Sequence, residues 1–330
     1  MHEWRNGQYR RRCPAAKLPP SGCIAPDENR PVSTQPHDDV LHRFLLPHAG
    51  VRGALVRLGA SWREVAGRAD YPPALHALLG EALAASALLT GNIKLDGALS
   101  IELKSASALR LLFAECNDLC HLRGLARWQE PLPEVLVLDG LADAVMAITL
   151  GNVERGQRYQ GLVELRGAGL AASLENYFSQ SEQLPVRILL AADAGQAVGL
   201  MLQKMPDEGG HAAAADDDAW NRVVQLTATL GPDELLATPA EPLLYRLYHE
   251  ESARLIETRP LAFGCSCSRE RVSAMLRSLG RDEVEAALAA RGDEIEVVCE
   301  FCAQRYAFDR IDAEHLLSVG AAPGAPGTAQ

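Results

Sequence analysis

The chain has 330 residues, of which 48% are apolar and 23% are charged, and its formal net charge is −11. This length and apolar content are enough for one large domain and a smaller one, each with its own core. The net negative charge excludes a protein-wide positive field, so neither nucleic acid nor an anionic membrane is an expected partner.

Residues 1–37 are dominated by proline, glycine and polar side chains, and their apolar residues follow no period. They contain no apolar run of the length that a secretory signal needs. We therefore expect a disordered tail at 1–37, a second one at 318–330, and a cytoplasmic protein.

From residue 38 the apolar pattern becomes regular. Residues 38–46 predict a short helix that breaks near Pro47, and 51–58 predict a strand. Residues 71–91 carry leucine or alanine every three or four positions, which predicts an amphipathic helix. Its densest apolar stretch is short, rich in alanine and interrupted by Glu81, so no transmembrane helix is expected.

Short strands dominate the next part of the chain. Residues 97–105 alternate apolar and polar side chains, as a half-buried strand does. One helix is expected at 170–184, and further strands are expected at 109–116, 122–129, 143–151, 158–167 and 185–193. Adjacent strands with few intervening helices predict an α+β domain, residues 38–206, with a largely antiparallel sheet and packed helices. No glycine-rich phosphate-binding motif follows a strand, so a nucleotide site has no support.

Residues 207–262 differ in composition from the preceding part of the chain. Eleven acidic and only four basic residues lie within 207–260. Two helices are expected, at 219–231 and 242–255, and the second has an apolar face made of Leu243, Leu244, Leu247 and Tyr248. Such a helix stays folded only while something packs against its apolar face. The region 207–262 is therefore expected to be a metastable acidic helical linker.

Four of the eight cysteines form two tight pairs near the end of the chain. Cys265 and Cys267 spell C-x-C, and after thirty-one residues Cys299 and Cys302 spell C-x-x-C. Clustered thiols in an intracellular protein indicate metal or redox chemistry. Two short pairs supply the four corners of a tetrahedron, and sulfur-only ligation favours zinc.

Residues 263–317 predict a small fold around such an ion. Ser268 can cap a helix that Gly280 ends. A second helix is expected at 284–291, followed by a strand, a metal-binding turn and a strand within 294–309. Few large apolar side chains lie here, so the metal is expected to decide whether the region folds.

The pairs are compatible with a permanent structural zinc site or with a redox switch. Each pair can close on itself as a disulfide with little backbone movement. Metal-bound sulfur is held as thiolate, which is the form that reacts with oxidants. The spacing alone leaves both possibilities open.

Several further stretches occur in a characteristic order. They are RYQGLVEL at 158–165, LENYFSQSEQLPVR at 174–187, LYRLYHEE at 244–251 and the SRER that follows the first cysteine pair. Together with the cysteine pairs they resemble the heat shock protein 33 family, the 33 kDa chaperonins, over residues 38 to 317. This resemblance implies an ATP-independent holdase chaperone and not an enzyme. It also implies binding of unfolding client proteins and a homodimer in the oxidised state.

The resemblance also implies which residues form the redox switch. It implies that Cys265, Cys267, Cys299 and Cys302 bind one Zn²⁺ per chain in the inactive reduced form. Oxidation to the disulfides Cys265–Cys267 and Cys299–Cys302 then releases zinc and unfolds the zinc-binding region and the linker. From the apolar linker face we expect four client-binding residues: Leu243, Leu244, Leu247 and Tyr248.

The other four cysteines fall outside this motif. Cys13 and Cys23 lie in the N-terminal extension, which the family pattern lacks. Cys116 and Cys120 are expected to pack at a strand end and its turn.

Two rival functions are weighed against the chaperone. A zinc ribbon that binds nucleic acid would need clustered basic and aromatic residues at the metal turn, where CEFCAQRYAFDR has only two arginines beside two acidic residues. A thiol–disulfide oxidoreductase would carry C-x-x-C at the start of a helix, whereas CEFC lies between two strand-like segments.

Overall fold

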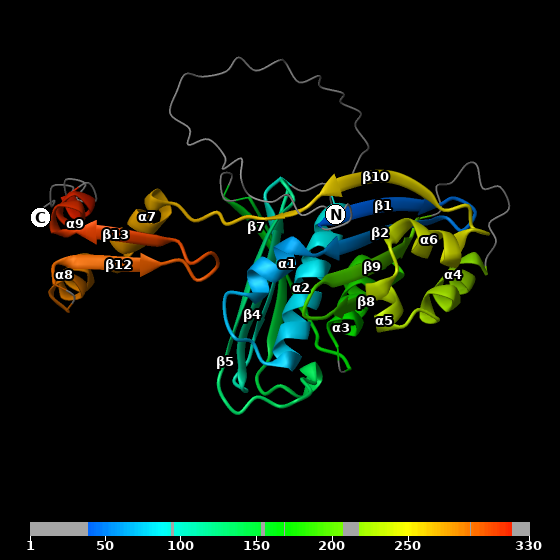
Figure 1. Ribbon diagram of the computed structural model, residues 1–330, viewed down its shortest axis with the longest axis horizontal. Coiled ribbons are helices and arrows are strands. Elements are labelled where there is room, and N and C mark those ends of the chain that lie inside the picture. The colour runs from blue at the N-terminus through cyan, green and yellow to red at the C-terminus, as the bar shows by residue number, and fades with distance from the viewer. Residues whose placement is uncertain are drawn as a thin grey trace, which may run out of the picture. The chain divides into compact units, whose positions relative to one another are not determined.

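The computed structural model describes residues 39–93, 96–152, 156–167, 169–206, 218–290 and 292–318 (Figure 1). The tail expected at 1–37 lies outside these residues, and so does all of the one expected at 318–330 except Ser318. The first part of the expected linker, 207–217, also lies outside them.

A five-stranded sheet has the order β10-β1-β2-β9-β8, and each neighbouring pair is antiparallel. Its strands are β1 (Val40–Leu46), β2 (Val51–Leu58), β8 (Val186–Ala192), β9 (Ala197–Lys204) and β10 (Arg254–Pro260). The apolar run of β9 is a strand that the sequence analysis left unassigned.

A six-stranded sheet has the order β11-β5-β4-β3-β6-β7 and is antiparallel except for the β11–β5 pair. Its strands are β3 (Ala98–Lys104), β4 (Leu109–Asn117), β5 (His121–Trp128), β6 (Val145–Asn152), β7 (Gln157–Val163) and β11 (Ala262–Phe263). Two largely antiparallel sheets with packed helices confirm the predicted α+β class.

Helix α2 (Pro73–Asn92) contacts strands of both sheets (Figure 1). Fourteen of its residues are buried, so it is enclosed on most sides and is not the amphipathic helix that was expected. Its length and composition would suit a membrane span, but 78% of its apolar window is buried within the protein. A core helix of a globular fold explains that composition.

Four shorter helical elements accompany the sheets. Helix α1 (Ala60–Ala66) follows β2, and the 3₁₀ turn η1 (Leu138–Gly140) precedes β6. The helix predicted at 170–184 is observed as α3 (Leu170–Tyr177), which continues into the π-helical turn η2 (Phe178–Glu182).

Strand β1 replaces the helix that was predicted at 38–46. Leu41 belongs to the core around α2, whereas Phe44 belongs to the core on the opposite face of the sheet. Because the strand is buried on both faces, two buried residues three positions apart imitate a helical period. Strands β2 and β10 flank β1 and satisfy its backbone groups.

The helices α4 (Ala219–Ala228), α5 (Pro232–Ala237) and α6 (Ala240–Tyr248) pack on the face of the five-stranded sheet that is opposite α2. Figure 1 shows all three on this side of the sheet. The helix predicted at 242–255 ends early, at Tyr248, because Arg254 already begins β10.

The C-terminal segment, residues 264–318, has a small core of its own. Its elements are α7 (Arg269–Leu279), α8 (Arg281–Ala290), β12 (Glu294–Val298), β13 (Arg305–Asp309) and α9 (Arg310–Ser318), the last of which was not predicted. The Ser268 hydroxyl accepts a hydrogen bond from the Arg271 amide at 3.2 Å, which confirms the predicted N-cap of α7. Gly280 ends α7 with φ of 92°. Seven buried residues form this core: Val272, Leu276, Val284, Leu288, Ile295, Phe308 and Ala313.

Candidate metal centre

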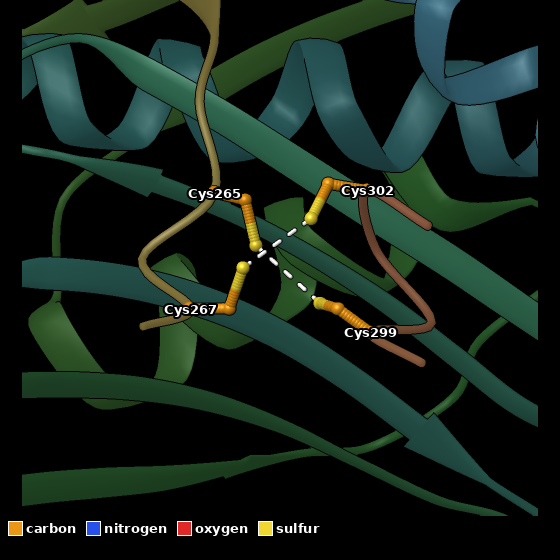
Figure 2. A group of neighbouring side chains, drawn as sticks. All are labelled: Cys265, Cys267, Cys299 and Cys302. Atoms are coloured by element: carbon orange, nitrogen blue, oxygen red, sulfur yellow. Dashed lines mark hydrogen bonds between the residues drawn. The ribbon is translucent and has the colours of Figure 1, made fainter. Parts of the chain in front are cut away.

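Two short backbone segments bring the four paired cysteines together. Cys265 and Cys267 follow β11, and Cys299 and Cys302 occupy the turn between β12 and β13. The Cys299 amide donates to the Gln304 carbonyl at 2.9 Å, and Ala303 takes a positive φ of 59°, so the turn is tight. Figure 2 shows all four side chains pointing toward one another. The C-x-x-C lies between two strands, as predicted, and not at the start of a helix.

The four sulfur atoms fit a tetrahedral metal site. All lie within 4.8 Å of one another. The Cys265 and Cys299 sulfurs are 3.7 Å apart, and the Cys267 and Cys302 sulfurs are 3.3 Å apart. Sulfurs at about 2.3 Å from a central ion are separated by about 3.8 Å, whereas a disulfide needs about 2.05 Å. The four thiols are therefore free and placed as metal ligands would be. Among the described residues they form the one group of three or more metal-ligating side chains at such distances.

The thiols differ in their ionisation. Burial raises the pKa of Cys267, but hydrogen bonds with Tyr306 and the other thiols outweigh it and lower this pKa to about 7. The Tyr306 hydroxyl donates to the Cys267 sulfur at 3.1 Å, and this bond raises the pKa of Tyr306 to about 12. Burial raises the pKa of Cys302 to about 12 and also raises that of Cys265. In the metal-free thiol form, Cys267 therefore reaches the nucleophilic thiolate near neutral pH.

Arg123 on β5 connects the cysteines to the six-stranded sheet. Its Nε donates to Glu115 of β4 at 2.7 Å, and its guanidinium also interacts with the Cys265 side chain. The guanidinium carbon lies 4.5 Å from the ring centroid of Phe301, which is between Cys299 and Cys302. Sequence analysis missed Arg123 because no local pattern marks an arginine on a strand as the neighbour of cysteines far along the chain.

The expected client-binding residues are buried on α6. The side chains of Leu243, Leu244, Leu247 and Tyr248 all belong to the core between the linker helices and the five-stranded sheet. The ring of Tyr248 stacks on that of Phe44 with centroids 6.1 Å apart, and its hydroxyl is 2.7 Å from the Thr227 hydroxyl. These four residues and the four cysteines thus lie against different sheets.

Arg57 of β2 is a second residue that sequence analysis missed. Its buried guanidinium donates to the carbonyl oxygens of Leu235 at 3.1 Å, of Thr238 at 2.8 Å and of Leu236. These carbonyls lie at the end of α5 and the start of the connection to α6. A charged donor that satisfies helix-end carbonyls fixes this part of the linker to the sheet.

Cys116 and Cys120 are buried free thiols, as predicted. Cys116 lies near the end of β4, and Cys120 lies in the turn before β5 with φ of 62°. Burial is the main cause that raises the pKa of Cys116 to about 12, so this thiol stays protonated. Both residues are therefore packing residues.

The fold and the four-thiol centre define a protein of two largely antiparallel sheets with a C-terminal segment whose four thiols could hold a metal ion. The Hsp33 protein family model matches residues 39–309, and the chain belongs to this family. A 33 kDa chaperonin of Nitrosococcus oceani is 44% identical over 280 residues, which cover 85% of this chain and 94% of that protein. A 33 kDa chaperonin of Shewanella oneidensis is 42% identical over 86% of this chain and 97% of that protein.

A solved structure supports the same fold. The crystal structure of the 33 kDa chaperonin (heat shock protein 33 homolog) of Thermotoga maritima superposes with a TM-score of 0.71 at 21% sequence identity. The superposition covers 86% of this chain and 99% of that one.

Proposed function

We propose that this chain is a redox-regulated, ATP-independent holdase chaperone that acts in the cytoplasm on unfolding proteins. The observation that carries the proposal is the gathering of four free thiols at tetrahedral distances in a segment with a core of only seven buried side chains. Its relatives are named 33 kDa chaperonins, which supports a binding protein and not an enzyme.

In the reduced state, Cys265, Cys267, Cys299 and Cys302 are the ligands of one Zn²⁺. When bound, zinc keeps the four sulfurs as thiolates and joins the residues after β11 to the turn between β12 and β13. Because a small core supplies little stability, this cross-link is what keeps residues 263–317 folded.

Oxidation by a peroxide breaks this arrangement. Cys265 with Cys267, and Cys299 with Cys302, each lose two electrons and form a disulfide. Two molecules of hydrogen peroxide accept the four electrons and, with protons, become four molecules of water. All four ligand sulfurs are consumed, so the segment can no longer retain the ion. The inter-segment distances of 3.7 and 3.3 Å offer the alternative pairings Cys265–Cys299 and Cys267–Cys302, which peptide mapping of the oxidised protein distinguishes.

Unfolding then spreads from residues 263–317 to the linker, 207–262. This linker is joined to the C-terminal segment through β10 and β11. Its strand β10 pairs with β1, and its helices pack on the domain 38–206 by an apolar face. Loss of that packing exposes the four apolar residues of α6 to clients and to the second subunit of an oxidised homodimer: Leu243, Leu244, Leu247 and Tyr248.

The test uses one sample measured before and after peroxide at elevated temperature. Zinc content and suppression of thermal aggregation of a client are followed together. We expect one zinc per chain and little suppression before treatment, then no zinc and strong suppression afterwards. Zinc loss without a gain in suppression would leave only a structural metal site, and salt-sensitive binding of nucleic acid would favour the zinc ribbon.

A further inference from the structure

The turn between β12 and β13 is held against the six-stranded sheet by side chains as well as by the cysteines. Phe301 contacts the ring of Phe113 on β4, with centroids 5.5 Å apart, and Glu300 pairs with Arg127 on β5. On the other side of the site, β11 pairs with β5 at Ala262 and Phe263. The cysteine cluster therefore sits directly over strands β4 and β5.

We infer that Arg123 is the positioning residue that makes this docking depend on the charge of the cysteine cluster. One guanidinium contacts the sheet through Glu115 and the turn of the second cysteine pair through Phe301, and it interacts electrostatically with Cys265 of the first pair. The inference deepens the proposed function and rests on it.

The charge of the cluster changes with its redox state. Four thiolates around one Zn²⁺ form a dianion, whereas two disulfides are neutral. A half-buried cation beside the cluster is attracted only to the reduced form, and low exposure limits screening by salt. Oxidation thus removes the electrostatic part of the docking in addition to the metal cross-link.

Arg127 provides an internal comparison on the same strand and the same face. Its side chain and that of Glu300 are 58% and 57% exposed, while those of Arg123 and Glu115 are each 18% exposed. Exposed ion pairs contribute little because solvent and salt screen them. Arg127 should therefore matter much less than Arg123, although both are arginines that contact the same turn.

The experiment measures transfer of zinc from the reduced, zinc-loaded full chain to a chelator in the presence of reductant. Arg123→Met keeps the apolar stem and removes the charge, and we expect transfer about tenfold faster than in the wild type at low salt. We expect this difference to shrink only slightly at high salt, because the Arg123 side chain is only 18% exposed. Arg123→Lys keeps the charge and should stay within about threefold of the wild type. Arg127→Met is the matched control and should stay within about twofold.

A second variant separates docking from stability of the sheet. Phe301→Leu changes a side chain on the turn, outside the sheet, and should speed amide hydrogen exchange at residues 299–303 while exchange in β4 and β5 is unchanged. In the oxidised state the wild type and Arg123→Met should exchange alike at 299–303. If Arg123→Met fails to fold, faster exchange in Phe301→Leu supports the docking, and unchanged exchange overturns it.

The inference is overturned if Arg123→Met and the wild type release zinc at the same rate. It is equally overturned if Arg123→Lys behaves like Arg123→Met, because charge would then play no part. A wild-type protein that holds no zinc would instead refute the proposed function itself, so the two failures are distinguishable.

Discussion

The linker helices and the C-terminal segment are both small parts of the molecule, but they are held in different ways. The linker helices bury one apolar face on the five-stranded sheet, and Arg57 satisfies their end carbonyls. The C-terminal segment has only a small core, and four sulfurs from two short backbone segments meet beside it; we propose that they stabilise it through a bound metal ion. Heat and core mutations should thus act first on the linker, whereas oxidants and chelators should act first on the C-terminal segment.

The largest expected effect comes from removing one ligand. Cys265→Ser should abolish zinc retention and unfold residues 264–318, because structural zinc contributes roughly 10–16 kcal/mol of apparent binding free energy in small domains. Hydrogen exchange and metal analysis of the reduced protein measure this change. Cys120→Ala, which alters a buried thiol outside the site, should retain the metal. Full protection of α7 and α8 in Cys265→Ser would contradict the proposed dependence on metal.

The second prediction acts on the linker alone. Leu243 is fully buried, so Leu243→Ala should weaken docking of α6 by about 2–5 kcal/mol through the lost apolar contact and the cavity left behind. We expect faster exchange in α4 to α6, unchanged zinc content, and higher aggregation suppression by the reduced protein. The control Tyr245→Ala, on the same helix but 72% exposed, should change little. Loss of zinc in Leu243→Ala would show that the linker and the C-terminal segment are not stabilised separately.

The third prediction places a pH dependence in the large domain. Burial raises the pKa of Glu81 on α2 to about 7, so the folded state holds this proton more tightly than the unfolded state does. As pH rises from about 4.5, the unfolded chain ionises first, and stability falls until the folded-state pKa is passed. Glu81→Gln should therefore raise the free energy of unfolding by roughly 2–3 kcal/mol at pH 8 and far less near pH 4.5.

Urea unfolding of the zinc-loaded protein at the two pH values measures this difference. Glu134→Gln, at an exposed carboxylate in the same domain, is the control and should have little effect at either pH. Equal stabilisation by Glu81→Gln at both pH values would show that packing, not charge burial, is responsible.

The smallest expected effect concerns an ion pair on α8. Arg281 and Glu285 are 3.0 Å apart and more than half exposed, so Glu285→Gln should destabilise the C-terminal segment by only about 0.3 kcal/mol. Zinc transfer to a chelator should be unchanged within about twofold. A large increase in that rate would mean that surface charges, and not the sulfurs, stabilise the segment.

The sequence predicts the cysteine cluster because its chemistry is local. Each pair lies within one turn of backbone, and Ser268, Gly280 and the flanking strands are marked by capping and alternation. Arg123 and Arg57 carry no such mark, since each acts across the fold on a segment remote in the chain. The same holds for Arg127, which pairs with Glu300 although the two residues are 173 positions apart.

The errors in the predicted fold have the same origin, because distant parts of the chain decide the local structure there. Strand β1 shows a helical spacing because its two faces are buried by two different layers, which only the tertiary structure supplies. Strand β10 was placed partly in a helix because its residues are mostly exposed and show no clean alternation. Helix α2 was predicted correctly as a helix, but it contacts strands of both sheets, including β8 and β9, which are far away in sequence.

The pairing of β10 with β1 also constrains how the protein is made. His42 and Thr258 face each other across these strands although 216 residues separate them. During synthesis, β1 leaves the ribosome long before β10 exists, so the five-stranded sheet stays incomplete at that edge until translation is nearly finished. The nascent chain must therefore keep an open strand edge from aggregating for most of the time that it takes to translate.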